Sequence, residues 1–310
     1  MPSGAFGQPK GKVWRIGFLG SATAQGFARQ LDALLEGLRE LGYVEGKNIV
    51  IEYRWAEGNY ERLPGLAVQL ARLGVDVIVT HSTPGTRAAK QSTTAIPIVM
   101  AAIGDAVAAG VVTNLARPGG NITGNTFFNP ELAAKRLEII KDAMPRARRI
   151  AALLNPDNPI TDAVLRAMQH TAKSLKLDLQ QFVAREPAEL DGAFAAMATK
   201  RIEAFATSED PMIVANAKVI ADLATRRKLP SIGFSEFADV GGVLGFGANI
   251  AEMFHRAAIY VDKILKGAKP GDLPVEQSSK FEIVVNLRTA RTLGVKLPDL
   301  VLQRADRVIE

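Results

Sequence analysis

Short apolar runs alternate with segments of helical periodicity along nearly the whole chain, and this alternation restricts the fold to the α/β class. In the first half we expect buried strands at residues 13–19, 49–55, 75–80 and 98–102. Between the first two runs, apolar residues recur at helical spacing from Phe27 to Leu41, and Gly42 follows as a stop signal. Strands that alternate with helices form parallel sheets covered on both faces.

The same alternation begins again in the second half, which indicates two similar, doubly wound lobes. We expect strands at 149–154, 177–182, 204–207, 231–234 and 281–285, and helices at 161–175, 188–198, 211–227 and 251–265. A chain of 310 residues suits two domains of ordinary size. The glycines and proline of residues 117–124 separate the two runs and suit a sharp turn, so we expect a hinge there.

The composition excludes several kinds of site and partner. There is no cysteine, so disulfides, thiolate nucleophiles and cysteine-bearing zinc sites are excluded. The formal charge is +6, from 38 Lys and Arg against 32 Asp and Glu. The basic residues are spread along the chain, and the densest clusters, at 146–149 and 226–228, lack the interleaved aromatic residues of a nucleic-acid site. We therefore predict no nucleic-acid partner.

Neither a membrane span nor a signal peptide is visible in the sequence. No apolar run reaches the ~18 residues that a bilayer span needs. Residues 1–12 are polar and rich in Gly and Pro, without the hydrophobic region of a signal peptide. Two alternatives stay open at this point: a cytoplasmic protein, or an exported protein whose signal was removed.

Polar segments follow the predicted strands in both halves of the chain. They are residues 20–23, 81–84, 104–105, 155–158, 208–211 and 235–236. In open parallel sheets, ligands bind outside the carboxyl ends of the strands. The segments are rich in hydroxyls, amides and carboxylates, so we expect a site for a small polar molecule where they meet.

Two of these segments start a helix in the same way. Thr83 precedes Pro84 and Asp210 precedes Pro211, so that a capping residue stands before proline at the first helical position. A helix start carries free N–H groups and partial positive charge. The uncharged Ser82–Thr83 site suits a ligand carboxylate, whereas Asp210 would attract a ligand cation. The alternative is that both are simple helix caps.

Other candidate contacts also have two interpretations. Asp105 either pairs with a ligand amine or caps the helix that follows it. His81 is a candidate ligand contact, but no second histidine lies nearby to make a metal site with it. Four phenylalanines near the hinge or the strand ends either stack on a ligand ring or belong to the core: Phe127, Phe128, Phe234 and Phe237.

Motifs for catalysis or nucleotide binding are absent. The sequence contains no GxGxxG, GxxxxGK[ST], HExxH, GxSxG or SxxK. The three histidines, His81, His170 and His255, lie in separate segments without a nucleophile partner. We therefore predict no catalytic residue, no metal and no cofactor.

Several segments together resemble the ABC transporter substrate-binding protein family, whose better-known relatives handle tryptophan or tyrosine. The resemblance runs from Trp14 to the C-terminus, and its most specific parts are residues 37–49, 53–58, 96–99, 115–124, 260–270, 273–277 and 280–282. It implies a type I periplasmic binding protein fold, with two lobes joined by three crossovers near Thr123, residues 245–247 and Lys280. The lobes would be residues 1–123 plus 247–279, and 124–246 plus 280–310.

The resemblance also implies export to the periplasm, a membrane permease as partner and a small-molecule solute as ligand; we predict a monomer. Carried onto this chain, the family's contact loops are those holding Ser21, Ser82, Thr83, Asp105, Thr126, Asn155, Asp210 and Phe234. The chain departs from the family pattern at Ala106, where proline is usual, at Leu154, where an aromatic residue is usual, and at Phe246, where tyrosine is frequent. The departures leave an aromatic ligand open.

The sequence thus predicts the solute-binding component of an ABC importer rather than an enzyme. The ligand would be an amino acid or a small carboxylate, because the predicted site combines uncharged helix starts with acidic side chains. One alternative is a ligand-sensing domain of a signalling system that shares the fold, although no helix-turn-helix precedes the first strand. Another is an α/β enzyme without a recognisable motif.

Overall fold

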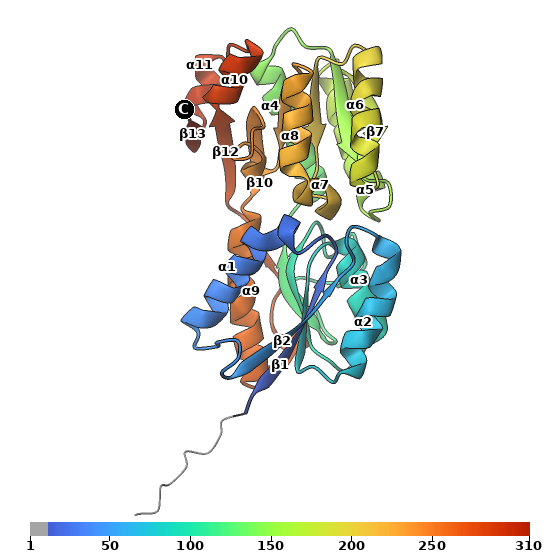
Figure 1. Ribbon diagram of the computed structural model, residues 1–310, viewed down its shortest axis with the longest axis vertical. Coiled ribbons are helices and arrows are strands. Elements are labelled where there is room, and N and C mark those ends of the chain that lie inside the picture. The colour runs from blue at the N-terminus through green and yellow to red at the C-terminus, as the bar shows by residue number, and fades with distance from the viewer. Residues whose placement is uncertain (1–11) are drawn as a thin grey trace, which may run out of the picture.

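The computed structural model describes residues 12–310, which form two α/β lobes stacked end to end (Figure 1). The sheet of the first lobe has six strands in the order β11-β5-β4-β3-β1-β2. All neighbouring strands in it are parallel. The strands are β1 (Trp14–Gly20), β2 (Ile49–Trp55), β3 (Val77–Thr80), β4 (Ile98–Ile103), β5 (Ile122–Thr126) and β11 (Glu276–Gln277).

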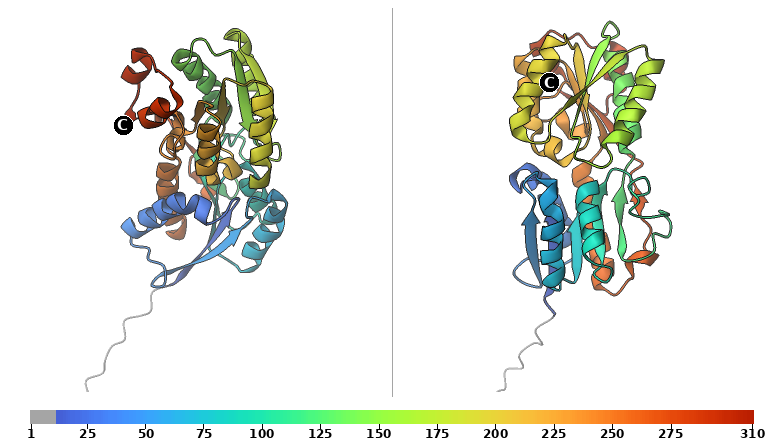
Figure 2. Two further views of the ribbon diagram at one scale, coloured as in Figure 1. Left: turned by 45° about the horizontal axis from the view of Figure 1, so that its top comes forward. Right: turned by 90° about the vertical axis from the view of Figure 1, so that its right-hand side faces the viewer.

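Helices cover both faces of this sheet (Figure 2). Covering is required because β3 and β4 are buried along their whole length. On one face, α1 (Ala28–Glu40) packs against α9 (Ile250–Leu265), a helix that returns from far along the chain. On the other face, α2 (Leu63–Arg72) lies beside α3 (Thr83–Ser92).

The second lobe has a seven-stranded sheet in the order β13-β12-β10-β9-β8-β6-β7. Its strands are β6 (Arg149–Leu154), β7 (Asp178–Val183), β8 (Ala204–Thr207), β9 (Ser231–Gly233), β10 (Leu244–Ala248), β12 (Phe281–Asn286) and β13 (Arg307–Ile309). Its helices are α4 (Asn129–Ala143), α5 (Thr161–Ser174), α6 (Leu190–Thr199), α7 (Pro211–Ala215), α8 (Ala217–Arg226), α10 (Leu287–Leu293) and α11 (Asp299–Gln303). The predicted architecture of two α/β lobes is confirmed.

One pair of strands departs from the parallel pattern: β10 and β12 are antiparallel. The direction follows from the route of the chain. Strand β10 runs towards the first lobe, where α9 begins, and β12 enters the second lobe from the first after β11. Two strands that cross the same junction in opposite senses pair antiparallel.

Three segments connect the lobes, after β5, after β10 and between β11 and β12 (Figure 1). The expected boundaries at 123/124 and 246/247 each cut a strand, because β5 continues to Thr126 and β10 to Ala248. The chain leaves a sheet only after its strand has finished pairing, which the glycine signal alone does not reveal. Gly124 is needed for strand pairing and not for a hinge. Its φ is +133°, and a Cβ at this position would collide with the backbone of Met100 in β4.

Residues 1–11 are outside the described part of the chain, so the expectation about a signal region lies there almost entirely. Within residues 12–310, no helix has both the length and the apolar character needed to cross a membrane.

Candidate ligand-binding cleft

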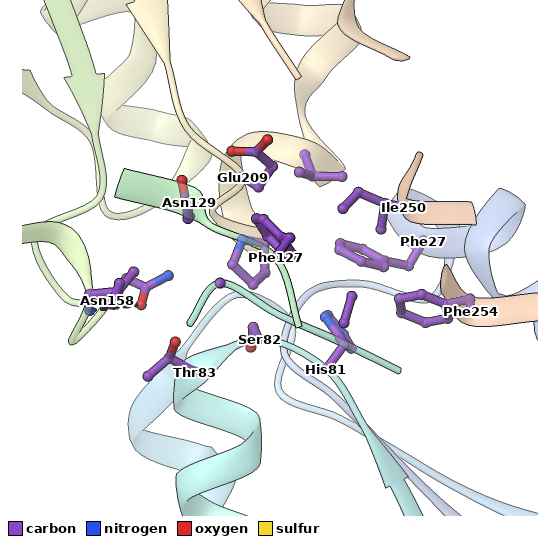
Figure 3. Close-up of a pocket in the computed structure, with 15 residues that line it drawn as sticks. Phe27, His81, Ser82, Thr83, Phe127, Asn129, Asn158, Glu209, Ile250 and Phe254 are labelled. Atoms are coloured by element: carbon purple, nitrogen blue, oxygen red, sulfur yellow. Dashed lines mark hydrogen bonds between the residues drawn. The ribbon is translucent and has the colours of Figure 1, made fainter. Parts of the chain in front are cut away.

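A cleft lies between the lobes, at the carboxyl ends of strands from both sheets (Figure 3). The cavity itself has a volume of about 30 Å³, and the space reaches about 410 Å³ when the open mouth is counted. The lining residues come from both lobes and from the hinge: Phe27, His81, Ser82, Thr83, Ala102, Gly104, Phe127, Asn129, Asn158, Ile160, Glu209, Pro211, Val214, Ile250 and Phe254. The site therefore needs both lobes, and closing or opening them changes it.

Aromatic rings form one wall of the cleft (Figure 3). The ring centroids of Phe27 and His81 are 4.3 Å apart, and those of His81 and Phe254 are 5.5 Å apart. Phe27, from the short helix before α1, and Phe254, on α9, are both nearly fully buried. Rings at these distances form a stable apolar surface against which a flat ligand group can pack.

His81 contributes to this wall as a neutral ring. Burial lowers its pKa to about 3, so the imidazole is uncharged at neutral pH. Its Nε2 accepts a hydrogen bond from the backbone N–H of Ser21 at 3.2 Å, which leaves the proton on Nδ1. Ser21 is fully buried and is not among the lining residues, so it supports the cleft from behind.

The start of α3 faces the cleft through Ser82 and Thr83. Ser82 is the N-cap, and its Oγ lies 2.8 Å from the Oγ of Ser21. The φ of Ser82 is +65°, in the region that favours glycine. A serine in this conformation costs conformational free energy, which the rest of the fold must offset. Thr83 follows with its Oγ1 buried and without a hydrogen-bond partner among the described residues. The Thr83 hydroxyl and the positive N-terminal end of α3 therefore both face the cleft.

The start of α4 presents a second unpartnered atom. Asn129 is 2% exposed, and its Oδ1 has no hydrogen-bond partner within residues 12–310. Among the described residues, Thr83 Oγ1 and Asn129 Oδ1 are the two buried side-chain polar atoms without a hydrogen-bond partner, and both residues line the cleft. A buried polar atom without a partner costs ~1–3 kcal/mol, which a bound polar molecule would recover.

Glu209 brings a carboxylate to the cleft, held by a buried arginine. Arg136, on α4, is completely buried and contacts both carboxylate oxygens of Glu209. The guanidinium also donates to Thr207 O at 2.8 Å and, through Nε at 2.9 Å, to Phe246 O. Among the described residues that line the cleft there is no Lys or Arg. The carboxylate of Glu209, although paired with Arg136, keeps lone pairs for a donor.

Asp210 does not line the cleft, contrary to the expectation that it attracts a ligand cation. It is 2% exposed, caps α7, and its carboxylate already accepts hydrogen bonds from the N–H groups of Met212 and Ile213. Three side chains donate to it as well: Asn155, Asn158 and Tyr60. Burial raises the pKa of Asp210, and these donors oppose the rise. Asn155, also a predicted contact, belongs to this network and not to the lining.

Three more predicted contacts lie elsewhere. Thr126, the last residue of β5, donates to Ile103 O and accepts from the N–H of Ala106, which holds the turn that follows β4. Phe234 packs on Phe237 in the core of the second lobe. Asp105 accepts from the N–H groups of Val107 and Ala108 at 3.0 and 2.9 Å. These bonds hold a turn, because the helix expected after Asp105 does not form: no helix lies between β4 and β5. Of the eight predicted residues, the lining includes Ser82 and Thr83.

The Asp105 geometry gives a direct prediction. We expect Asp105→Ala to lower the free energy of unfolding by about 1 kcal/mol, because two N–H groups of the turn lose their acceptor, and to leave solute affinity unchanged. Urea unfolding and solute titration of the same variant measure the two quantities. A tenfold loss of affinity at unchanged stability would instead show that Asp105 touches the solute.

The sequence contained a usable signal for one missed residue. Asn129 precedes Pro130 at a helix start, as Thr83 precedes Pro84: both are the first helical residue, with Phe128 and Ser82 as the N-caps. The expectation that Thr83 is the cap was therefore wrong by one residue, whereas Asp210 does cap α7. Glu209 stands next to a predicted contact, but nothing in the sequence shows that it, rather than Asp210, faces the cleft. Ile250 and Phe254 lie on α9, which reaches the cleft only because the chain returns to the first lobe.

Comparisons with known proteins agree with this geometry. A family model described as "ABC transporter substrate binding protein" matches residues 22–309. A tyrosine-binding protein of Clostridioides difficile strain R20291 is 27% identical over 263 residues, which are 84% of this chain and 75% of that protein.

Two solved structures are similar over 96% of this chain and all of theirs. One is a conserved domain protein of Vibrio cholerae O1 biovar eltor, with 27% identity and a TM-score of 0.88. The other is an ABC domain from Streptococcus pneumonia in complex with L-Trp, with 26% identity and a TM-score of 0.86.

Proposed function

Because the chain belongs to the ABC transporter substrate-binding protein family, we propose that its cleft captures an amino acid with an aromatic side chain and delivers it to a membrane permease. The observation that carries the choice of ligand is the pair of unpartnered atoms, Thr83 Oγ1 and Asn129 Oδ1. One belongs to each lobe, so a molecule that bonds to both is bound best when the lobes are closed.

The charges around the cleft suit a zwitterion. The start of α3, with the Thr83 hydroxyl, suits the ligand carboxylate, because helix N-termini stabilise negative charge. Asn129 Oδ1 and the Glu209 carboxylate are acceptors for the ligand ammonium group. The remaining part of the ligand would pack against the wall of Phe27, His81 and Phe254.

The departures from the family pattern do not count against an aromatic ligand. Ala106 and Leu154 are fully buried, and neither they nor Phe246 are among the lining residues. The C. difficile relative is described as tyrosine-binding, and the S. pneumonia structure contains L-Trp. Together with the ring wall, these relatives support tyrosine, tryptophan or phenylalanine as the first solutes to test.

A thermal-shift screen tests the proposal. We expect the L-aromatic amino acids to stabilise the protein, by about 2.7 kcal/mol at a concentration of 100 times Kd, because they bind the folded state only. The matching amines and the matching carboxylic acids, which each lack one end of the zwitterion, should stabilise it much less. Stabilisation by none of these molecules, or equally by sugars, would contradict the proposal.

Thr83→Val tests the atom that carries the proposal. The variant keeps the shape but removes the hydroxyl, so we expect solute affinity to fall about tenfold or more, since hydrogen bonds to charged groups are worth ~1.5–3 kcal/mol. The free protein should lose no stability, because this hydroxyl has no partner to lose. Isothermal titration calorimetry measures the affinity.

Thr123→Val is the matched control. Thr123 is also buried, but its hydroxyl donates to Leu273 O at 2.8 Å and lies outside the cleft lining. We expect this variant to lose about 1 kcal/mol of stability and to keep the affinity. The reverse pattern in the two variants would place the solute away from α3.

The permease partner and the periplasmic location are part of the same proposal and rest on the family. Uptake of labelled solute by cells that lack the chain, with and without its restoration, tests the transport role. We also propose that the solute is released unchanged, which its recovery after incubation with the protein checks by mass spectrometry.

A further inference from the structure

We infer that Tyr60 is a positioning residue for solute binding: its hydroxyl holds the lobes closed and, through Asp210, fixes Asn158 against the solute, without touching the solute itself. The inference rests on the proposed function, because it concerns how the closed cleft is kept. Tyr60 lies outside the lining of the cleft and lines a second cavity between the lobes, whereas Asn158 lines the cleft.

The hydrogen bonds of Tyr60 cross from one lobe to the other. Tyr60 begins a short 3-10 helix, Tyr60–Arg62, between β2 and α2 of the first lobe. Asp210 caps α7 in the second lobe, and the Tyr60 hydroxyl donates to its Oδ2 at 2.9 Å. The same hydroxyl accepts from the backbone N–H of Met212 at 3.4 Å. Separating the lobes therefore breaks both contacts.

The Tyr60 hydroxyl acts as a donor in this contact. Burial, followed by the negative charge of Asp210, raises the pKa of Tyr60 well above its ordinary value, so the proton stays on the phenol. Asp210 Oδ2 then has two donors, the Tyr60 hydroxyl from the first lobe and Asn158 Nδ2, at 2.9 Å, from the second. Losing Tyr60 would leave a buried carboxylate oxygen with half of its side-chain donors.

The network ends at the cleft. Asn158 Nδ2 is held by Asp210, and Asn158 Oδ1 accepts from the N–H of Ile160 at 3.3 Å. Both Asn158 and Ile160 line the cleft. When Tyr60 is in place, the carboxylate that orients this amide is itself fixed from the opposite lobe. Closure and the shape of the site are therefore coupled through one carboxylate.

Other contacts between the lobes do not provide the same coupling. Arg29 and Asp239 form an ion pair at 3.3 Å, but the Arg29 side chain is 56% exposed, and such pairs contribute little in water. Gly26 packs against Ala215 of α7, which is a van der Waals contact without a hydrogen bond. The buried Glu236 also accepts from the N–H of Ile250 at 2.9 Å, but it does so where the chain itself crosses between the lobes after β10. Tyr60–Asp210 combines charge, burial and a path to the cleft at a place away from the crossovers.

Tyr60→Phe removes the hydroxyl and keeps the ring. With L-tyrosine and L-tryptophan as probes, we expect the dissociation rate to rise about tenfold or more, the worth of a hydrogen bond to a charged group. The association rate should change little, because the encounter with open lobes precedes the contact. Stopped-flow fluorescence separates the two rates, and a purely structural role would not divide them in this way.

Tyr43→Phe is the matched control. The Tyr43 hydroxyl donates to Asp262 Oδ1 at 2.9 Å, the same type and length of bond, but both residues belong to the first lobe. We expect this variant to lose stability and to keep both rates. In an Asp210→Asn background, Tyr60→Phe should add little further effect, because the two residues act as one unit.

Distance measurements test the contact independently of the probe. The chain has no cysteine, so spin labels at Gln91→Cys and Ala188→Cys, exposed positions on the two lobes, report only their own separation. We expect Tyr60→Phe to shift the population towards longer distances, and Tyr43→Phe to leave it unchanged.

If no amino acid binds the wild-type protein, the proposed function fails and the distances of the free protein alone decide the role of Tyr60. If Tyr60→Phe had the same solute dissociation rate and the same spin-label distances as the wild type, the inference would be overturned.

Discussion

Arg136→Met is expected to lower the free energy of unfolding by about 3–5 kcal/mol, the usual loss when one partner of a buried ion pair is removed. Arg136 is completely buried, and the Glu209 side chain is 2% exposed. Methionine would leave that carboxylate without a counter-charge and the carbonyls of Thr207 and Phe246 without their side-chain donor. Urea-induced unfolding measures the loss.

Two comparisons isolate the cause. Lys135→Met makes the same change one position earlier on α4, where the side chain is 43% exposed and pairs with Glu138 at the surface, so we expect a loss below about 1 kcal/mol. Replacing Arg136 and Glu209 together by methionine should recover most of the stability, because no charge is then left unpaired. Equal losses in the single and double variants would show that packing, not charge, is responsible.

Lowering the pH is expected to destabilise the protein through His81. The unfolded histidine titrates near 6.5, whereas in the folded protein burial lowers the pKa to about 3. Below pH 6.5 the unfolded state therefore takes up a proton that the folded state refuses, and stability is lost as pH falls towards 3. The loss is roughly 1.4 kcal/mol per pH unit, or about 2–3 kcal/mol at pH 4.5.

His81→Gln should remove this dependence. The amide oxygen of glutamine can still accept from the Ser21 N–H, but it does not titrate in this range. Subtracting the unfolding free energies of this variant from those of the wild type at each pH cancels the contributions of the carboxylates. His170→Gln makes the same substitution at an exposed position on α5 and is the control for the change of side chain itself. Parallel profiles for wild type and His81→Gln would mean that folded His81 accepts a proton in this range.

The sequence predicted the two α/β lobes and most of their strands, because such elements depend on neighbours along the chain. It missed β5, β10, β11 and β13. Short apolar runs such as residues 77–80 and 98–103 favour interior strands, and the helical spacing around Leu34 and Leu38 favours a helix that covers one face of a sheet. The sharp turn expected at residues 117–124 does exist before β5, but the crossing to the other lobe comes after that strand.

The prediction of the site was partial. Reading the residue after each strand found Ser82 and Thr83, because a strand end and a helix cap are local features. The same rule chose Asp210 over Glu209, its neighbour. The choice depends on which carboxylate meets Arg136 from α4 and which meets Tyr60 from the other lobe, and neither partner is near in sequence.

Local patterns in this chain were enough to establish two parallel-sheet lobes with polar loops gathered at one edge of each sheet. Which side chains face the solute, which stand behind them and which connect the lobes followed only from the packing of distant segments. The physical reason is that a polar side chain can form its hydrogen bonds either with nearby backbone or with a residue that is distant in sequence and close in the folded structure. Within residues 12–310, neither source reaches Thr83 Oγ1 and Asn129 Oδ1, and for this reason we propose that these atoms bind the solute.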